Sequence, residues 1–309
     1  MNGIVVIDKP SGKTSHDVVK EVKKILEIKK AGHTGTLDPL ATGVLPVCIN
    51  EGTKLAQFFA TGTKDYRATM LLGVTTDTLD SDGKIVTQRQ INVDQAEIEE
   101  EVTKWIGTIK QTPPRYSALK FKGKPLYKWA RQGVNIAAKP RHVEILSITI
   151  EDIKLPFVTF NVSCSKGTYI RSLCSDIGES LGCGACLTGL RRTRNGEFYD
   201  QSAIALEVIA QEEKKHALVR CIIPLVDTLM DFTSIAIDET LANKIKSGHQ
   251  PTAENMNTHQ FPFLDAGAMV KFATNNSLIA IGKVLYSHDE INTLRNTQPA
   301  VKIMRVFNH

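Results

Sequence analysis

The stretch from Gly32 to Gly43, which reads GHTGTLDPLATG, constrains this chain more than any other. It sets glycines and a proline around a single carboxylate, Asp38, between a lysine-rich segment and the apolar run 44–49. A turn-rich segment between two regular elements can hold an acidic side chain at a fixed place. An isolated Asp-Pro pair would only start a turn. With so many turn-forming residues around it, we expect Asp38 to be functional.

Length and composition indicate a globular protein with room for two domains. The chain has 309 residues, 42% of them apolar and 23% charged, and a formal net charge of +5. These values are ordinary, and the small positive charge is only a weak argument for an anionic partner. No apolar run approaches a membrane span, and the N-terminus lacks the features of a signal peptide. We therefore expect a cytoplasmic protein.

A P-loop is excluded by spacing. The tripeptide Gly12-Lys13-Thr14 looks like the end of that phosphate-binding motif, but Ile7 stands where the motif needs a glycine. This argues against nucleotide hydrolysis as the function.

Two candidate metal motifs are excluded as well. The loop with Asp77, Asp80 and Asp82 has no glutamate at the twelfth position that an EF-hand requires. Cys183 and Cys186 have C-x-x-C spacing but lack the second ligand pair of a zinc site. We expect unpaired, buried cysteines and no metal.

Periodicity predicts a mixed α and β first domain. The expected strands are 1–8, 44–49, 64–73, 142–154, 157–165 and 187–195, and the expected helices are 14–28, 53–60, 94–105 and one ending near 182. Arg171 falls in the first turn of that last helix, where the helix dipole disfavours a cation. We expect Arg171 to meet a carboxylate or phosphate, with a solvent-facing side chain as the alternative.

The segment 104–141 is typical of an RNA-binding surface. It holds ten lysines and arginines, no acidic residue and five interleaved aromatic residues. Basic side chains neutralise phosphates, and aromatic rings stack on bases. The alternative is a basic loop that its aromatic residues tie to the core, but ordinary surfaces mix both signs of charge. We expect this segment to bind RNA.

From about residue 234 the character of the chain changes. Short β-like runs at 234–237, 268–272, 279–285 and 300–306, with a helix over 239–246, predict a small β barrel. Its charge is nearly balanced, with seven basic and six acidic residues, so charge assigns it no function.

Taken together, the motifs resemble the TruB family, the bacterial tRNA pseudouridine-55 synthases. The segments that carry the resemblance are 8–12 with 14–15, 32–43, 64–68, 117–120, 126–133, 166–171 and 190–192. Their order and spacing cover nearly the whole catalytic region. The tail is similar to the PUA RNA-binding domain, with weaker identity.

The resemblance implies an α+β fold over residues 1–230: a mixed, largely antiparallel sheet with flanking helices. Residues 104–141 would be a basic RNA-binding insertion, and 234–309 a small β-barrel PUA-like domain. The implied enzyme isomerises a flipped-out uridine in the T-loop of tRNA to pseudouridine, with no cofactor or metal. Its implied partner is the T-arm of tRNA; neither a membrane nor an obligate protein partner is implied, and we expect a monomer.

Three residues would carry the chemistry by this resemblance. Asp38 would be the catalytic aspartate, Tyr66 would stack on the target base and is the candidate for removing its proton, and Arg171 would pair with Asp38. The reaction needs a carboxylate near the sugar, and an arginine partner keeps a desolvated carboxylate ionised. Whether Asp38 attacks C1′ or abstracts a sugar proton stays open.

Four further residues would bind the RNA by this resemblance. His33 would enter the tRNA loop where the flipped bases had been, and Leu190 would line the pocket. Lys9 and Tyr169 would help to hold the RNA. The alternative function is a tRNA-binding folding chaperone whose catalytic activity is secondary, although pure binding does not require Asp38, Tyr66 and Arg171.

Overall fold

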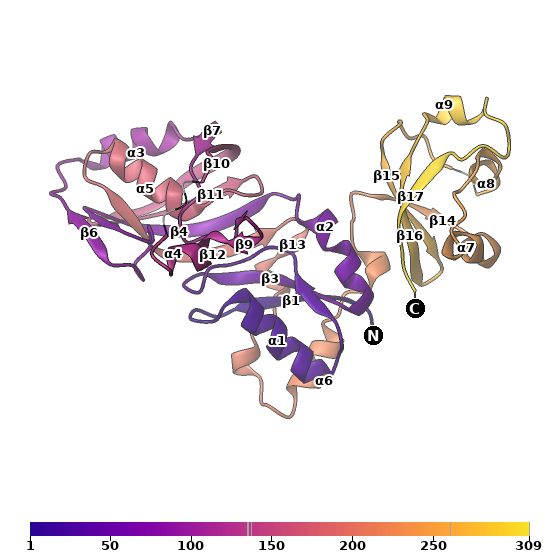
Figure 1. Ribbon diagram of the computed structural model, residues 1–309, viewed down its shortest axis with the longest axis horizontal. Helices are drawn as coiled ribbons and strands as arrows, with labels where there is room; N and C mark the ends of the chain where they lie inside the picture. Colours follow the sequence, from indigo (N-terminus) through magenta and orange to yellow (C-terminus); the bar gives the residue numbers. More distant parts are fainter. Residues whose placement is uncertain (135, 137, 260, 309) are drawn as a thin grey trace.

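Two sheets organise the part of the chain that the computed structural model describes, residues 1–134, 136, 138–259 and 261–308 (Figure 1). The larger sheet contains β1 (Gly3–Lys9), β2 (Ala31–His33), β3 (Thr42–Ile49), β4 (Lys64–Leu72), β7 (Gly107–Gln111), β10 (Arg141–Lys154), β11 (Phe157–Cys164), β12 (Ala185–Asn195) and β13 (Phe198–Tyr199). Its order is β1-β3-β12-β4-β11-β10-β7, with β2 on β3 and β13 on β12. Its pairings are antiparallel apart from β12 with β3, so the predicted mixed, largely antiparallel sheet is confirmed.

Both faces of the sheet are covered where β1 lies. Val5 and Ile7 pack into the main core with the helices, while Ile4 and Val6 pack into a second cluster on the opposite face. Successive strand residues point to opposite faces, which explains why β1 reads as a continuous apolar run rather than an alternating one. The helices of this part of the chain are α1 (Ser15–Leu26), α2 (Ala56–Phe59), α3 (Gln95–Thr103), α4 (Leu126–Ala130), α5 (Ile170–Ser180) and α6 (Lys214–Arg220).

Helix α1 begins and ends at signals that are local to the sequence. Thr14 and Asp17 form a capping box, and Val18, Val22 and Leu26 are buried in the main core. The helix ends at Leu26, two residues before the predicted end, because Glu27 turns into the left-handed region at φ 54°.

Several short elements were not predicted from the sequence. They are β7, α4 and two hairpins, β5 (Val74–Thr76) with β6 (Ile85–Gln88) and β8 (Lys120–Phe121) with β9 (Lys124–Pro125). Strands of two to five residues give too few periods to be recognised, and the side chains of β6 and β8 are largely exposed.

The second sheet differs from its prediction in one respect. Its strands are β14 (Thr233–Ala236), β15 (Met269–Thr274), β16 (Ser277–Val284) and β17 (Val301–Val306), in that order, and its helices are α7 (Glu239–Lys246), α8 (Ala253–Thr258) and α9 (His288–Ile291). Helix α7 and the four strands were predicted. The predicted closed barrel is wrong for the described residues, because β14 and β17 remain the edges of an open sheet. Buried residues of α7 and α8 cover its apolar side chains instead.

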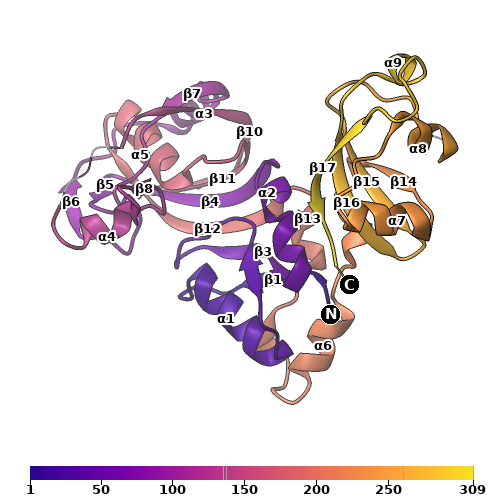
Figure 2. The same ribbon diagram turned by 45° about the vertical axis from the view of Figure 1, so that its right-hand side comes forward.

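An apolar cluster joins the two sheets. Ile4 and Val44 of the first part contact Leu278, Ile281 and Phe307 of the second through this cluster. The two chain ends consequently lie near one another, as both views show (Figures 1 and 2). The packing fixes the second sheet against β1 and β3.

Candidate active site

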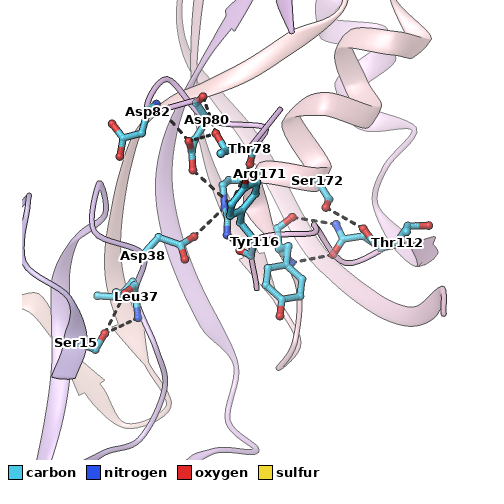
Figure 3. Close-up of polar contacts among 12 residues, drawn as sticks. Ser15, Leu37, Asp38, Thr78, Asp80, Asp82, Thr112, Tyr116, Arg171 and Ser172 are labelled. Atoms are coloured by element: carbon cyan, nitrogen blue, oxygen red, sulfur yellow. Dashed lines mark hydrogen bonds and ion pairs between the residues drawn. The ribbon is translucent and has the colours of Figure 1, made fainter. Parts of the chain in front are cut away.

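The loop around Asp38 is clamped by the loop before α1. The Gly12 amide donates a hydrogen bond to the Pro39 carbonyl at 2.9 Å. Ser15 Oγ donates to the Leu37 carbonyl at 3.0 Å and accepts from the Leu37 amide at 2.8 Å (Figure 3). The residues on both sides of Asp38 are therefore held by a separate segment.

The Lys9 side chain is buried and contacts both of these loops. It is fully buried, and its ammonium donates to the carbonyls of Pro10, Lys13 and Pro39 at 2.8, 2.6 and 3.2 Å. Burial lowers its pKa to about 8, although the charge of Asp38 opposes this shift. Lys9 therefore has no free donor directed at a phosphate in this arrangement, and its contacts tie the two loops together.

Asp38 pairs with Arg171, as the sequence analysis expected. Arg171 Nε lies 2.9 Å from Asp38 Oδ2 (Figure 3). The Arg171 side chain is 4% exposed and that of Asp38 is 36% exposed. The carboxylate therefore remains accessible from outside, while its cationic partner is enclosed by protein.

Arg171 is itself fixed from several directions. Its Nη1 donates to the Thr78 carbonyl at 3.0 Å and its Nη2 to the Tyr116 carbonyl at 2.8 Å. A second carboxylate, Asp80 Oδ2, lies 3.4 Å from Nη1 (Figure 3). One guanidinium thus joins Asp38 to the β5–β6 hairpin and to residues 104–141, the basic segment.

Asp80 was not predicted as a site residue, because the sequence pattern of its loop suggested only a calcium site. Asp80 is buried, accepts a hydrogen bond from Thr78 Oγ1 at 2.5 Å and pairs with Arg171. Burial raises its pKa, while Thr78 and Arg171 act in the opposite direction. The sequence signal that could have pointed to Asp80 was the arginine at the start of α5, because one guanidinium can pair with two carboxylates.

The position of Arg171 depends on the start of α5. Gln111, at the end of β7, accepts from the Tyr169 amide at 2.8 Å and donates to the Tyr169 carbonyl at 3.0 Å. Ser172 Oγ donates to the Thr112 carbonyl at 3.0 Å. These bonds satisfy backbone groups at a helix start that has no side-chain cap. Tyr169 is half-buried, with the Arg141 guanidinium 5.0 Å from its ring centre.

Tyr66 and Leu190 lie on two neighbouring strands of the larger sheet. Tyr66, on β4, is buried, and burial raises its pKa. Leu190, on β12, packs at the edge of the main core, and its carbonyl accepts from Thr42 Oγ1 at 3.4 Å. The charge of Asp38 adds to the rise in the pKa of Tyr66, so these two side chains are near enough to interact electrostatically.

His33 ends β2 at the start of the Asp38 loop. It is half-buried, and its Nδ1 has no hydrogen-bond partner among the described residues. Burial lowers its pKa, and the charges of Arg192 and His16 add to this effect. A histidine with a lowered pKa therefore flanks the Asp38 loop.

The described residues contain no group of three side chains that could hold a metal ion, and both Cys183 and Cys186 are buried free thiols. Within the same residues, no helix is both long and apolar enough to span a membrane.

Comparison with known proteins assigns the chain to a class of enzymes. Residues 23–170 match the model of the TruB family pseudouridylate synthase N-terminal domain, and residues 171–230 match that of the tRNA pseudouridylate synthase B C-terminal domain. The tRNA pseudouridine synthase B of Syntrophus aciditrophicus is 52% identical over all of this chain and 99% of its own length. That of Geobacter sulfurreducens is 39% identical over the full length of both chains.

Solved structures agree with the fold. The chain superposes on one chain of the Cbf5-Nop10-Gar1 complex with a TM-score of 0.72 and 28% identity. The match covers 99% of this chain and 85% of the chain in the complex. The archaeal box H/ACA sRNP Nop10-Cbf5 complex gives a TM-score of 0.73 and 28% identity, over 99% and 86%.

The fold and its relatives therefore define a pseudouridine synthase, an enzyme that isomerises uridine to pseudouridine. Within that class the chain belongs to the TruB family, which confirms the resemblance noted in the sequence.

Proposed function

We propose that this pseudouridine synthase acts on tRNA, that its target is a uridine of the T-loop, and that Asp38 is its catalytic residue. The observation that carries the proposal is the ion pair between the accessible Asp38 and the enclosed Arg171, at 2.9 Å. An accessible carboxylate that a fixed guanidinium orients suits nucleophilic or base chemistry on a sugar. The curated relatives that span the whole chain carry the name tRNA pseudouridine synthase B.

The reaction rearranges bonds without any net redox change. The bond between C1′ and N1 breaks, the uracil rotates, a bond between C1′ and C5 forms, C5 loses its proton to a base, and N1 gains a proton from solvent. Asp38 either attacks C1′ or removes a sugar proton; Arg171 pairs with it and orients it, and Asp80 holds Arg171. Tyr66 receives the base against its ring and takes the C5 proton, and Leu190 closes the pocket. A target base must leave its stack to reach such a site.

The basic segment supplies the RNA-binding surface in this proposal. Lys120, Lys122 and Lys124 of the β8–β9 hairpin are all exposed. Lys122 lies 5.6 Å from the Phe121 ring centre and Lys124 5.3 Å from that of Trp129. Cations over the exposed Phe121 ring and the half-buried Trp129 ring provide both phosphate contacts and stacking faces. Its residues 135 and 137 lie outside the described residues.

The remaining assignments follow the same proposal. His33 enters the tRNA loop in place of the flipped bases, and Tyr169 holds the RNA. Lys9 supports the site through the loop contacts described above. Residues 1–230 form the catalytic domain, and residues 234–309 form a PUA-like RNA-binding domain. The enzyme acts as a cytoplasmic monomer.

Substrate selection can be tested with two short RNAs. We expect a stem-loop with the tRNA T-arm sequence to be converted to pseudouridine, and an anticodon stem-loop of equal length to remain unmodified. Nuclease digestion and dephosphorylation, followed by chromatography of the nucleosides, measure both. Equal modification of the two stem-loops would contradict T-loop recognition.

Neutralising the β8–β9 hairpin should weaken tRNA binding and flatten its salt dependence. Each phosphate contact contributes about 0.7 to 0.9 to the slope of log K against log salt concentration. The triple variant Lys120→Gln, Lys122→Gln and Lys124→Gln should therefore reduce that slope by about two, as measured by filter binding. Lys154→Gln, at the β10–β11 turn outside the basic segment, is the control. An unchanged slope in the triple variant would mean that the hairpin does not touch phosphates.

A further inference from the structure

Three arginines of β12 differ in their electrostatic partners. Arg191 pairs with Asp8 at 2.9 Å, and Arg194 pairs with Asp65 at 2.5 Å. Arg192 is 1% exposed, and no carboxylate of the described residues lies within ion-pair distance of it. An unneutralised guanidinium in the interior is unfavourable unless it serves a local purpose.

The hydrogen bonds of Arg192 go to both ends of the Asp38 loop. Its Nε donates to the Val44 carbonyl at 2.8 Å, and its Nη2 donates to the Gly35 carbonyl at 3.1 Å. Gly43 lies between them at φ +96°, and a Cβ there would approach the Arg192 carbonyl oxygen to 2.2 Å. The backbone and the side chain of Arg192 therefore both determine where this loop begins and ends.

The sheet register also places Arg192 opposite Tyr66. The two residues are direct partners between β12 and β4, which are antiparallel neighbours. Opposite residues of such a pair project to the same face of the sheet. Both side chains are buried, and the charge of the Arg192 guanidinium opposes the rise that burial causes in the pKa of Tyr66.

Burial, Cys164, Asp38 and Arg192 all influence the pKa of Tyr66, and Arg192 is the one among them that lowers it. Burial raises the pKa of Tyr66, and the Cys164 thiol and the Asp38 carboxylate add to that shift. The interactions with Arg192 lower it. Arg192 is thus the group in this set that favours negative charge on the Tyr66 oxygen.

The two buried lysines near Arg192 use their hydrogen bonds on backbone groups. Lys9 and Lys64 donate to backbone carbonyls, Lys64 to that of Gly62 at 2.7 Å. The charge of Arg192 lowers the pKa of Lys9, Lys64 and His33.

We propose that Arg192 is a positioning residue for pseudouridine formation, which fixes both ends of the Asp38 loop and stabilises negative charge on the Tyr66 oxygen. This rests on the proposed function, in which Tyr66 takes the C5 proton. A tyrosine acts as a base only as its phenolate, so Tyr66 first loses its own proton to solvent. The phenolate oxygen then accepts the proton from C5, and the electron pair of the C5–H bond returns to the uracil ring. The step needs no co-reactant.

The test compares Arg192→Met and Arg192→Lys with Arg194→Met, a matched control on the same strand. Three quantities are measured: tRNA affinity, the single-turnover rate over about pH 6 to 10, and the ionisation of Tyr66 in the free protein. Phenolate absorbance reports that ionisation, with Tyr66→Phe in each background subtracted. We expect Arg192→Met to slow turnover about 10²-fold, to leave tRNA affinity nearly unchanged and to raise the pH at which Tyr66 ionises. Arg192→Lys should restore the Tyr66 ionisation and part of the rate, and Arg194→Met should match the wild type.

Two results would overturn the proposal: turnover by Arg192→Met as fast as by Arg194→Met, or slowed turnover with an unmoved Tyr66 ionisation, which would indicate a structural role alone. If Arg192→Met does not fold, Arg192→Gln takes its place, because glutamine removes the charge but can still donate a hydrogen bond to a carbonyl. Slowed turnover with Tyr66 ionising at a higher pH than in the wild type supports the proposal, and an unmoved Tyr66 ionisation or unslowed turnover contradicts it. Pseudouridine formation by Asp38→Asn would instead overturn the proposed function, whatever the Arg192 variants do.

Discussion

Replacing Asp38 with asparagine is expected to abolish pseudouridine formation and to preserve tRNA binding. Asparagine keeps the shape of the side chain but removes the charge that acts on the sugar, so we expect the single-turnover rate to fall by at least about 10³-fold. Affinity for tRNA should stay within about threefold, because the proposed binding surface lies elsewhere. Rapid-quench assays of pseudouridine formation and filter binding measure the two quantities.

The control for this prediction is Asp82→Asn. Asp82 is an exposed carboxylate on the same side of Arg171 as Asp80 (Figure 3), and its loss should leave turnover unchanged. A cellular comparison then separates the two candidate roles. If the main role were that of a folding chaperone, Asp38→Asn would restore the growth of cells that lack the enzyme. If modification is the main role, it would not.

Replacing Arg171 with methionine is expected to reduce both stability and activity. The change leaves the buried Asp80 without its cation, along with two carbonyls that the guanidinium now satisfies. Breaking a buried ion pair of this kind lowers the free energy of unfolding by about 3 to 5 kcal/mol. Turnover should fall by at least about 10²-fold, because Asp38 also loses the partner that orients it. Urea unfolding and single-turnover assays are the measurements.

Arg89→Met provides the matched control on stability. Arg89 pairs with Glu179, which is also on α5, but both side chains are exposed. Such a surface pair contributes about 0 to 1 kcal/mol. Adding Asp80→Asn to Arg171→Met should recover part of the lost stability, since no buried charge is then unpaired. An Arg171→Met protein as stable as Arg89→Met, or one that turns over normally, would contradict the assigned role.

The sequence predicted best what depends on local patterns. Helix α1, the strand around Tyr66 and the pairing of Arg171 with an acidic partner could all be read from periodicity, capping residues and the position of a cation in a helix. Each of these signals lies within a few residues of the feature that it predicts.

What the sequence did not reveal depends on contacts between distant segments. Asp80 reaches Arg171 only because the β5–β6 hairpin lies against the start of α5. Arg192 is distinguished from Arg191 and Arg194 only by which carboxylates the fold brings near. The barrel prediction was wrong because strand content was visible in the sequence, whereas closure depends on which strands become edges.

The most direct test of the central claim is to map pseudouridine in a full-length tRNA transcript that carries no modifications. The wild-type protein and Asp38→Asn would each be incubated with the transcript, and carbodiimide modification with reverse transcription would locate pseudouridine. We predict a single new pseudouridine, in the T-loop, with the wild type and none with Asp38→Asn. A pseudouridine outside the T-loop, or one in the T-loop formed by Asp38→Asn, would contradict the account.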